Sequence, residues 1–430
     1  MQQQIIRRDH YLQKLIDRRE NGLIKVVTGI RRCGKSFLLF RLYYDYLLST
    51  GVKPGQIITA ALDDNACLDY RDPVKLSEYV QSKINGPDMH YLLIDEVQYA
   101  ISREELRDPE SIRLYNVLNG LMRLRNVDIY VTGSNSKMLT KDVMSVFRGR
   151  GDEVRVYPLS FREVYSFVGG DKSDAFAEYA LYGGMPLVLF QKTDADKMNY
   201  LRRLFSEVYF QDIAERYEIE LDDVLAELTD TLCSAVGSLT NVSKIVNTLK
   251  TVRNLNVADK TISKYLGYLT ESFLFSEAKR YDIRGRKYFE YPSKYYCTDV
   301  GLRNARLNFR QQEEAHIMEN LIYNELLCRD CSVDVGVVEI VEAENGRRKK
   351  LQCEIDFVIN LGMKKYYIQS ALHTDTPEKM STELRPLKYT RDFFKKLIVT
   401  KTSMRPWTDE DGIVHVGLYE FLLNPNSLEL

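Results

Sequence analysis

Apolar residues follow two different periods along the first 166 positions. Short apolar runs cover residues 23–28 (LIKVVT), 57–62 (IITAAL), 91–94 (YLLI) and 128–132 (DIYVT), and stretches of helical spacing such as residues 37–48 (FLLFRLYYDYLL) separate them. Short apolar runs favour buried strands, whereas apolar residues three or four apart favour helices. Strands that alternate with helices predict an α/β fold with a parallel doubly wound sheet, whose ligands lie at the carboxyl ends of the strands.

The rest of the chain shows three further patterns. Residues 171–230 have helical spacing that breaks at Gly183-Gly184 and Pro186, which predicts a helical lid. Residues 239–287 read as helix, turn, helix and strand pair, the order of a winged-helix unit. After residue 305 we expect a helix, a hairpin folded back at Asn345-Gly346 and another strand, which predicts a second α/β domain.

Charge and hydropathy exclude some classes of protein. The 430 residues contain 60 Lys and Arg against 61 Asp and Glu, a net charge of -1, so any attraction to nucleic acid or to an anionic membrane must be local. The first ten residues (MQQQIIRRDH) lack the apolar region of a signal peptide, and no apolar stretch reaches the roughly 18 residues of a membrane span. We therefore expect a cytoplasmic protein with no membrane contact.

The seven cysteines are an odd number, widely scattered and mostly within apolar segments. This distribution is typical of reduced thiols and predicts no disulfide framework. Cys328 and Cys331 form a CxxC pair, but a zinc site needs four ligands and the sequence has no second CxxC or HxxxH pair. We interpret the cysteines as structural, with a metal or redox role as the alternative.

Residues 29–36 (GIRRCGKS) match the P-loop pattern GxxxxGK[ST] between a predicted strand and a predicted helix. The two glycines let backbone N–H groups curve round phosphates, Lys35 reaches the β and γ oxygens, and Ser36 coordinates Mg²⁺. The helix N-terminus adds the positive end of its dipole. We therefore predict ATP and Mg²⁺ as cofactors. The predicted nucleotide-binding residues are Gly29, Ile30, Arg31, Arg32, Cys33, Gly34, Lys35, Ser36 and Phe37.

An acidic pair at the end of a predicted strand supports the P-loop prediction. The run at residues 91–94 ends in Asp95-Glu96, the arrangement of a Walker B segment at the carboxyl edge of a strand. Asp95 is the predicted magnesium residue, and Glu96 is the predicted general base that activates the attacking water. Two carboxylates that only cap the following turn are the structural alternative. The run at residues 128–132 continues into a polar end, residues 132–136 (TGSNS), where a γ-phosphate sensor would lie.

The segments LIKVVTGIRRCGKS, YLLIDEVQ, YVTGSNSKML, FRGR and VYPLSFREV occur in this order, followed by LYGGMP at 181–186 and KYYCTDVGLRNA at 294–305. This series resembles the prokaryotic AAA-type P-loop ATPases that carry a C-terminal DUF4143 domain of restriction-endonuclease-like fold. The resemblance implies that Ser134 or Asn135 is the sensor. It also implies that Arg148 or Arg150 is an arginine finger or a second sensor, in cis or across a subunit boundary. A solvated turn is the alternative for these arginines.

The predicted winged-helix unit has polar and basic residues that double-stranded DNA would attract. Its second helix carries Lys260, Thr261, Ser263, Lys264 and Tyr268, and its strand pair carries Arg284, Arg286 and Lys287, which could meet phosphates. Units of this size also dock proteins, and lysines on a helix are often only a solvated face. DNA and a protein partner both stay open.

The endonuclease-like resemblance implies a site built from a helix Glu, a strand Asp and Glu-x-Lys on the next strand, with two carboxylates on Mg²⁺. Glu319 or Glu325 matches the helix acid, Asp356 the strand acid and Gln369 the second acid, but Ala371 stands where the lysine belongs. Alanine cannot activate water. Lys364 or Lys365 from the neighbouring turn would be a substitute. We expect a vestigial site and a domain that serves binding or assembly, with an active nuclease as the alternative.

These patterns predict four domains: a P-loop AAA-type ATPase domain at 1–166, a helical lid or linker at 167–235, a winged-helix-like domain at 236–300 and a nuclease-like domain at 301–430. The predicted function is ATP hydrolysis coupled to binding of DNA or protein, with a homo-oligomer as a further expectation. A nucleotide-dependent switch or assembly platform and an ATP-linked DNA endonuclease are the alternatives.

Overall fold

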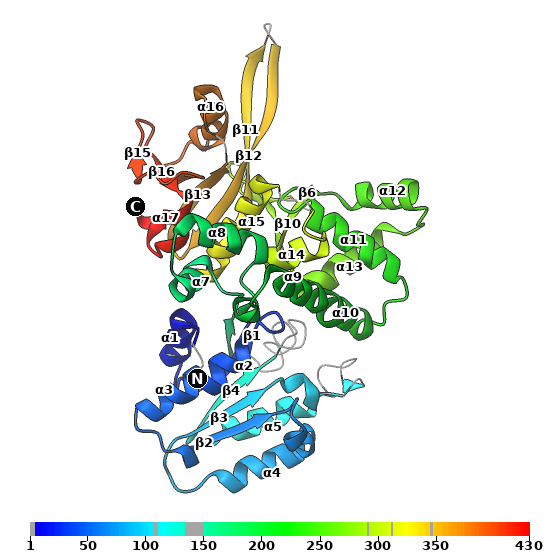
Figure 1. Ribbon diagram of the computed structural model, residues 1–430, viewed down its shortest axis with the longest axis vertical. Coiled ribbons are helices and arrows are strands. Elements are labelled where there is room, and N and C mark those ends of the chain that lie inside the picture. The colour runs from blue at the N-terminus through cyan, green and yellow to red at the C-terminus, as the bar shows by residue number, and fades with distance from the viewer. Residues whose placement is uncertain are drawn as a thin grey trace. The chain divides into compact units, whose positions relative to one another are not determined.

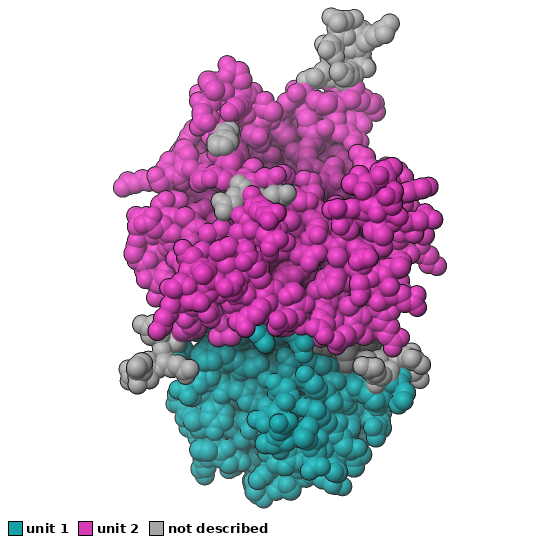
Figure 2. Space-filling model, turned by 45° about the vertical axis from the view of Figure 1, so that its right-hand side comes forward, with its two compact units in different colours: residues 1–158, 271–273 teal, residues 159–270, 274–430 magenta. Residues whose placement is uncertain are grey.

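The computed structural model describes residues 5–102, 104–105, 111–133, 150–289, 292–310, 313–344, 347–372 and 374–430, with the backbone alone at 342–344 and 347–349. The chain forms two compact units, residues 1–158 with 271–273 and residues 159–270 with 274–430 (Figure 2). Each unit is described by itself below. The division into four domains stays a prediction.

The first unit is built on a five-stranded sheet in the order β2-β3-β4-β1-β5, and each pair of neighbouring strands runs parallel (Figure 1). The strands are β1 (Ile24–Thr28), β2 (Ile57–Ala61), β3 (His90–Asp95), β4 (Val127–Thr132) and β5 (Gly151–Arg155). This confirms the predicted α/β class and the four predicted strands. The fifth strand, β5, was not predicted.

Helices pack on this sheet and connect its strands. They include α1 (Asp9–Asp17), α4 (Pro73–Lys83) and α5 (Arg113–Met122), with short 3-10 turns at Pro54–Gln56, Asn65–Arg71 and Val97–Ala100. The predicted helix after the glycine loop is one rod of three parts: α2 (Lys35–Phe37), a π-helical segment at Leu38–Tyr43 and α3 (Tyr44–Ser49). Its first turn therefore begins at the lysine of the loop.

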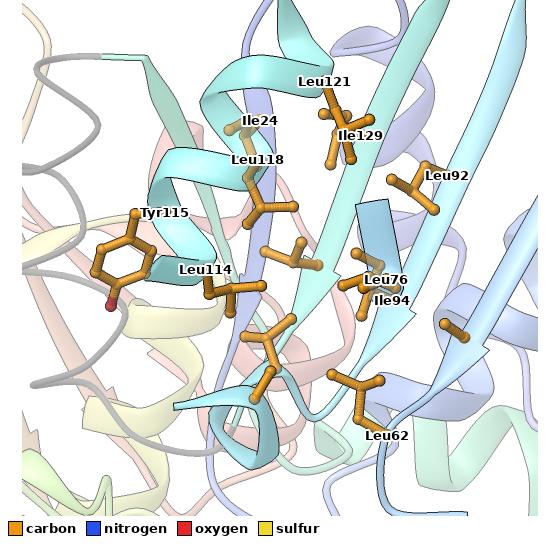
Figure 3. Packing of buried hydrophobic residues seen from close by; sticks show 14 of the residues in the cluster. Ile24, Leu62, Leu76, Leu92, Ile94, Leu114, Tyr115, Leu118, Leu121 and Ile129 are labelled. Carbon is orange, nitrogen blue, oxygen red and sulfur yellow. The ribbon is translucent and has the colours of Figure 1, made fainter. Parts of the chain in front are cut away.

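The core of the first unit lies between the sheet and the helices α4 and α5 (Figure 3). Leu118 of α5 lies near Ile24 of β1, Leu121 of α5 lies near Ile129 of β4, and all four are buried. Burial of such side chains stabilises the fold by about 1.5–3 kcal/mol each relative to exposure. This packing fixes the strand ends that carry the polar residues of the site.

The second unit begins with helices. They are α7 (Phe161–Val168), α8 (Lys172–Tyr182), α9 (Asp194–Arg203), a π-helical segment at Leu204–Phe210, α10 (Gln211–Arg216) and α11 (Asp222–Ser234), with a 3-10 turn at Pro186–Phe190. Ser160 and Glu163 form a capping box that starts α7. Helical structure was predicted for this region, and the breaks at the glycine pair and Pro186 separate α8 from α9.

The segment at Gly183–Gly184 packs on the start of α14 (Val300–Arg306). Asp299 caps α14 and accepts hydrogen bonds from the backbone N–H groups of Gly184 at 2.6 Å and Leu302 at 3.0 Å. A Cβ on Gly183 would lie 2.2 Å from an Asp299 carboxylate oxygen, and the φ of 71° also favours glycine. Burial raises the pKa of Asp299 to about 6. Two segments far apart in the sequence thus pack together at Asp299.

A three-stranded antiparallel sheet in the order β6-β10-β7 follows these helices. It comprises β6 (Leu239–Thr240), β7 (Phe275–Ala278) and β10 (Ser293–Cys297), and the helices α12 (Val242–Arg253) and α13 (Asp259–Glu271) lie between β6 and β7 in the chain. Asn241 caps α12 through the backbone N–H of Lys244. The two predicted helices are present as α12 and α13, whereas the sheet of β6, β7 and β10 was not predicted.

The predicted strand pair at residues 280–288 is part of a different sheet. β8 (Arg280–Asp282) pairs with β9 (Lys287–Tyr288), but β8 also pairs in parallel with β11 of the large C-terminal sheet. The guanidinium of Arg284 donates to the backbone carbonyls of Glu339 at 2.8 Å and Tyr389 at 2.7 Å. Arg284 is exposed but already hydrogen-bonded to two backbone carbonyls, and its contact with phosphate stays a prediction.

The C-terminal sheet has eight strands in the order β15-β16-β14-β13-β12-β11-β8-β9. The strands not yet named are β11 (Ser332–Glu344), β12 (Arg347–Leu361), β13 (Lys364–Ala371), β14 (Lys395–Thr400), β15 (Trp407–Thr408) and β16 (Ile413–Gly417). The helices α15 (Glu314–Cys328), α16 (Pro377–Lys388) and α17 (Leu418–Leu423) and a 3-10 turn at Ser427–Glu429 complete the unit. The predicted hairpin is confirmed by the antiparallel pairing of β11 and β12, while its turn residues Asn345 and Gly346 lie outside the described residues.

Candidate functional site

The glycine loop joins the carboxyl end of β1 to α2. Gly34 has a left-handed conformation with φ of 102°, and a Cβ on Gly29 would lie 2.1 Å from the carbonyl oxygen of Val156. Both positions therefore require glycine. The Lys35 side chain is buried, and its ammonium donates to the carbonyl oxygens of Gly29 at 3.0 Å and Ile30 at 3.1 Å. The lysine thus lies inside the curve of the loop.

A buried arginine braces the outer side of this loop. Arg8 is 3% exposed, and its guanidinium donates to the carbonyl oxygens of Cys33 at 2.9 Å and Tyr157 at 2.7 Å. The Cys33 thiol is buried and points to the carbonyl of Val156 at 3.5 Å, so only the backbone of Cys33 is available to a nucleotide. Arg8 had no signal in the sequence, because an arginine in a polar N-terminal stretch usually lies in solvent. Among the other predicted binding residues, Arg32, Ser36 and Phe37 are exposed.

Asp95 and Ser36 lie together, as the magnesium prediction requires. Asp95 ends β3 and is 5% exposed, and the hydroxyl of Thr132, at the end of the neighbouring β4, donates to its carboxylate. Burial raises the pKa of Asp95, while hydrogen bonds from the Thr132 and Ser36 hydroxyls act in the opposite direction. Because parallel strands end at one edge of the sheet, the three side chains meet there.

Glu96 has an uncommon backbone conformation, with φ of 52° and ψ of 52°. Its N–H donates to the Thr132 hydroxyl at 3.0 Å, and its carboxylate accepts a hydrogen bond from the Gln98 amide. The Glu96 side chain is half-buried. Thr132 thus orients both acidic residues. Polar residues were expected beside the Walker segments at this strand end, but no role was predicted for Thr132 or Gln98.

The predicted sensor and arginine residues divide into two groups. Ser134, Asn135 and Arg148 lie outside the described residues. Arg150 precedes β5, and its carbonyl accepts the N–H of Ile24 at 2.9 Å, at the amino end of β1. Lys35 and Asp95 are at the carboxyl edge of the same sheet. Arg150 is therefore not brought to the site within its own chain, because parallel strands place its backbone at the opposite edge.

The residues at this edge fit a magnesium nucleotide. The glycine at position 29 lets the loop pass close to the Val156 carbonyl, and the lysine, serine and aspartate supply the side chains that phosphates and Mg²⁺ require. The fit rests on Gly29, Lys35, Ser36 and Asp95 together.

A second polar cluster lies in the other unit. Glu319 of α15, Asp356 of β12 and Gln369 of β13 come together, as the endonuclease-like resemblance implied. The backbone N–H of Asp356 lies 3.4 Å from the side-chain Oε1 of Gln369, and the Ser370 N–H donates to the Asp356 carboxylate at 2.8 Å. The Gln369 amide donates to Glu383 at 3.0 Å.

Lys294 of β10 contacts three carboxylates of this cluster. Its ammonium lies 2.9 Å from Glu319, 2.7 Å from Glu354 and 3.6 Å from Asp356. Burial lowers the pKa of Lys294, but the three carboxylates outweigh burial and raise it. Burial and the neighbouring Glu319 raise the pKa of Asp356 well above its usual value, against the effect of Lys294. Neither Lys294 nor Glu354 was among the predicted site residues.

The structure excludes three of the alternatives for this cluster. Glu325 forms an ion pair with Arg329 at 2.7 Å and is not the helix acid. Lys364 pairs with Glu429 at 2.7 Å, and the ammonium of Lys365 lies over the rings of Tyr281 and Phe394. Neither lysine substitutes at Ala371, because both begin β13 whereas Gln369 is near its end.

The proposed DNA-reading face of α13 is partly engaged. Lys260, Ser263 and Lys264 are exposed. Tyr268 stacks on Tyr217 with ring centroids 3.7 Å apart, and the Lys264 ammonium lies over the Tyr268 ring at 5.5 Å. DNA contact through this helix stays a prediction.

Two further observations bear on the predicted classes. Among the described residues, no helix is long and apolar enough to cross a membrane, and no group of three or more His, Cys, Asp or Glu side chains is arranged to hold a metal ion. All seven cysteines, including Cys328 and Cys331, are free thiols.

Known protein families match two parts of the chain. A family described as "AAA domain" matches residues 21–165, and "Domain of unknown function (DUF8612)" matches residues 173–313. These matches do not show the predicted DUF4143 domain, and DUF8612 is found instead.

Solved structures match at low similarity. The Aeropyrum pernix ORC1 protein in complex with DNA is 14% identical, with 71% of this chain and 93% of that chain covered and a TM-score of 0.28. CDC6P from Pyrobaculum aerophilum is 11% identical, with 74% and 96% covered and a TM-score of 0.29.

Two relatives extend over most of the sequence. "Uncharacterized protein MJ1544" of Methanocaldococcus jannaschii is 25% identical over 362 residues, 80% of this chain and 74% of that protein. An "Uncharacterized protein" of Haemophilus influenzae is 32% identical over 429 residues, 98% of this chain and 100% of that protein. The chain therefore belongs to the same family as the Haemophilus influenzae protein, and its N-terminal part is an AAA domain of the P-loop ATPase type.

Proposed function

We propose that this protein binds ATP with Mg²⁺, hydrolyses it, and couples the nucleotide state to binding of DNA or of a protein partner. The observation that carries the proposal is the cluster at the carboxyl edge of the first sheet. There the Thr132 hydroxyl contacts Asp95 and the backbone of Glu96, Ser36 bonds Asp95, and Lys35 lies in the adjoining loop. No other polar cluster among the described residues combines a glycine loop with two acidic residues at strand ends.

Each residue of the cluster has a proposed role. Lys35 would hold phosphate oxygens with the ammonium that contacts Gly29 and Ile30, and Ser36 and Asp95 would hold Mg²⁺. Bound Mg²⁺ would neutralise developing charge on the phosphates. Glu96 would accept the proton of the attacking water, with its carboxylate positioned by Gln98. Ser134 or Asn135 is the proposed sensor.

An arginine finger supplied by a second copy is part of the proposal. Arg150 lies at the amino edge of its own sheet. A contribution from this arginine would therefore come across a subunit boundary, which implies a homo-oligomer. Arg148 is the alternative. Catalysis would then depend on protein concentration, because the site is complete only in the assembly.

The second unit would receive the nucleotide signal. The chain order from α11 to β10 and the sheet order β6-β10-β7 support a winged-helix unit, and the series α15, β11, β12, β13, α16 and β14 supports an endonuclease-like domain. Exposed lysines on α13 favour DNA as the partner. A protein-docking switch that ATP resets is the second candidate. Seven free thiols fit the reducing compartment of a cytoplasmic location, which we also propose.

Steady-state ATP hydrolysis tests the proposal. Lys35→Ala should lose nucleotide binding, whereas Glu96→Gln should keep binding and lose turnover by about 100-fold or more, since only the base is removed. Binding is measured separately with a fluorescent ATP analogue. Undiminished turnover in Glu96→Gln would contradict the role of Glu96, and undiminished turnover in Lys35→Ala would contradict the site itself.

A further inference from the structure

The endonuclease-like resemblance implies a divalent metal at Glu319, Asp356 and Gln369, and the structure has a different cation there. We infer that Lys294 is the resident cation of this cluster, so that its carboxylates bind an ammonium group in place of a divalent metal. The cluster would then be a metal-independent joint between the three-stranded and eight-stranded sheets. This inference does not rest on ATP hydrolysis.

The Lys294 ammonium group contacts three carboxylates. Glu319 comes from α15 and lies at 2.9 Å, while Glu354 at 2.7 Å and Asp356 at 3.6 Å come from β12. The Lys294 side chain is 5% exposed. Residues 354 and 356 share one face of their strand, because side chains alternate along it. Three carboxylates from two elements therefore converge on a lysine from a third.

A metal and this ammonium would compete for the same oxygens. Mg²⁺ binds oxygen at about 2.0–2.1 Å and Ca²⁺ at about 2.3–2.6 Å. A divalent ion held by Glu319 and Glu354 would therefore lie within a few ångströms of the Lys294 nitrogen, which contacts those same residues. Like charges at such separation in a poorly hydrated site repel strongly. The site accommodates one cation, and the chain supplies it.

The other ligand positions are also engaged within the protein. The Glu319 oxygen that contacts Lys294 accepts the Tyr296 hydroxyl at 2.7 Å, and Asp356 accepts the Ser370 N–H at 2.8 Å. The Gln369 side chain is held between the Asp356 N–H and Glu383. With Ala371 in the position of the catalytic lysine, the described residues do not fit a metal-dependent nuclease.

Metal-dependent stability tests the inference. The measurement is thermal unfolding of the full chain without nucleotide in an Asp95→Asn background, so that the ATP site adds no metal response. When Lys294 is intact in this background, the unfolding temperature should be equal in EDTA, Mg²⁺ and Mn²⁺. Lys294→Met leaves the carboxylates without a counter-charge, so its unfolding temperature should fall in EDTA and recover by about 3 °C or more in about 5 mM MnCl₂. Lys294→Arg is the matched control, which keeps the charge and should show no metal response.

Direct Mn²⁺ binding completes the test. In the same background, titration calorimetry should show the same Mn²⁺ binding with and without Asp356→Asn, because no Mn²⁺ binds at Asp356. One Mn²⁺ per chain that Asp356→Asn abolishes would overturn the inference, as would Mn²⁺-dependent nicking of plasmid DNA that Asp356→Asn abolishes. Both measurements decide the question even if Lys294→Met fails to fold. A folded Lys294→Met variant that shows no response to Mn²⁺ would also count against the inference.

Discussion

At the scale of the residue, Thr132 holds two neighbouring acidic residues through one hydroxyl group, which contacts the Asp95 carboxylate and the Glu96 N–H. Thr132→Val removes the hydroxyl and keeps the shape of the side chain. Loss of hydrogen bonds of this kind costs about 1.4 kcal/mol, so kcat/KM for ATP should fall about tenfold. Thr132→Ser keeps the hydroxyl and serves as the control.

The pH dependence of Thr132→Val gives a second measurement on the same residue. Burial raises the pKa of Asp95, and the Thr132 hydroxyl lowers it because it stabilises the carboxylate. Removal of the hydroxyl should raise the pKa of Asp95 further. Since the carboxylate is the form that holds Mg²⁺, the acid limb of the kcat/KM profile should move to higher pH. If kcat/KM falls tenfold but the acid limb stays at the same pH, the Thr132 hydroxyl acts on catalysis through Glu96 and not through Asp95.

Some residues of both clusters were predictable and others were not. The glycine loop and Asp95-Glu96 carry local signals, since the residues that act together are neighbours in sequence. Glu354 was within reach as well, because strand alternation places it on the face of Asp356. Lys294 had no such signal. It lies 25 positions from Glu319 and 60 from Glu354, and only the packing of β10 with α15 and β12 brings the three residues together.

At the scale of the element, two helices end in the same backbone conformation with different surroundings. Gly169 ends α7 with φ of 66° and ψ of -155°, and Gly183 ends α8 with φ of 71° and ψ of -160°. A Cβ on Gly169 meets nothing within 4 Å, whereas a Cβ on Gly183 lies 2.2 Å from Asp299. The pair therefore separates backbone strain from steric conflict.

Alanine at each position gives the test. Gly169→Ala should lower the free energy of unfolding by about 1–3 kcal/mol through strain alone. Gly183→Ala carries the same strain and must also displace the Asp299 carboxylate, so it should cost about 2 kcal/mol more. Urea unfolding of the two variants measures the difference. Equal losses of unfolding free energy would show that Asp299 moves at little cost and that the packing between Gly183 and the start of α14 is loose.

Element prediction failed where pairing is remote. The first four strands of the sheet have apolar runs, but β5 reads GDEVR, which carries too few apolar residues to form one. The strand pair at residues 280–288 was expected as a wing, yet its strand β8 pairs with β11, more than 50 residues later. The local sequence of β8 indicates a strand but does not show which sheet the strand joins.

At the scale of the whole molecule, the question is whether DNA bound to the second unit changes the rate of ATP hydrolysis in the first. If α13 reads DNA, double-stranded DNA should stimulate hydrolysis, and the stimulation should weaken as salt rises because phosphate contacts release counterions. Lys260→Glu reverses an exposed charge on α13 and should reduce the stimulation by about tenfold at low salt. Turnover without DNA provides the baseline for each variant.

The control for this experiment is Lys379→Glu, which makes the same charge change at an exposed position of α16. A general effect of net charge would reduce stimulation equally in both variants, because the long-range field does not depend on the helix that carries the charge. A loss confined to Lys260→Glu would identify α13 as the DNA-reading helix. Hydrolysis indifferent to DNA in the wild type would favour the docking switch, since a protein partner would then have to supply the signal that DNA does not.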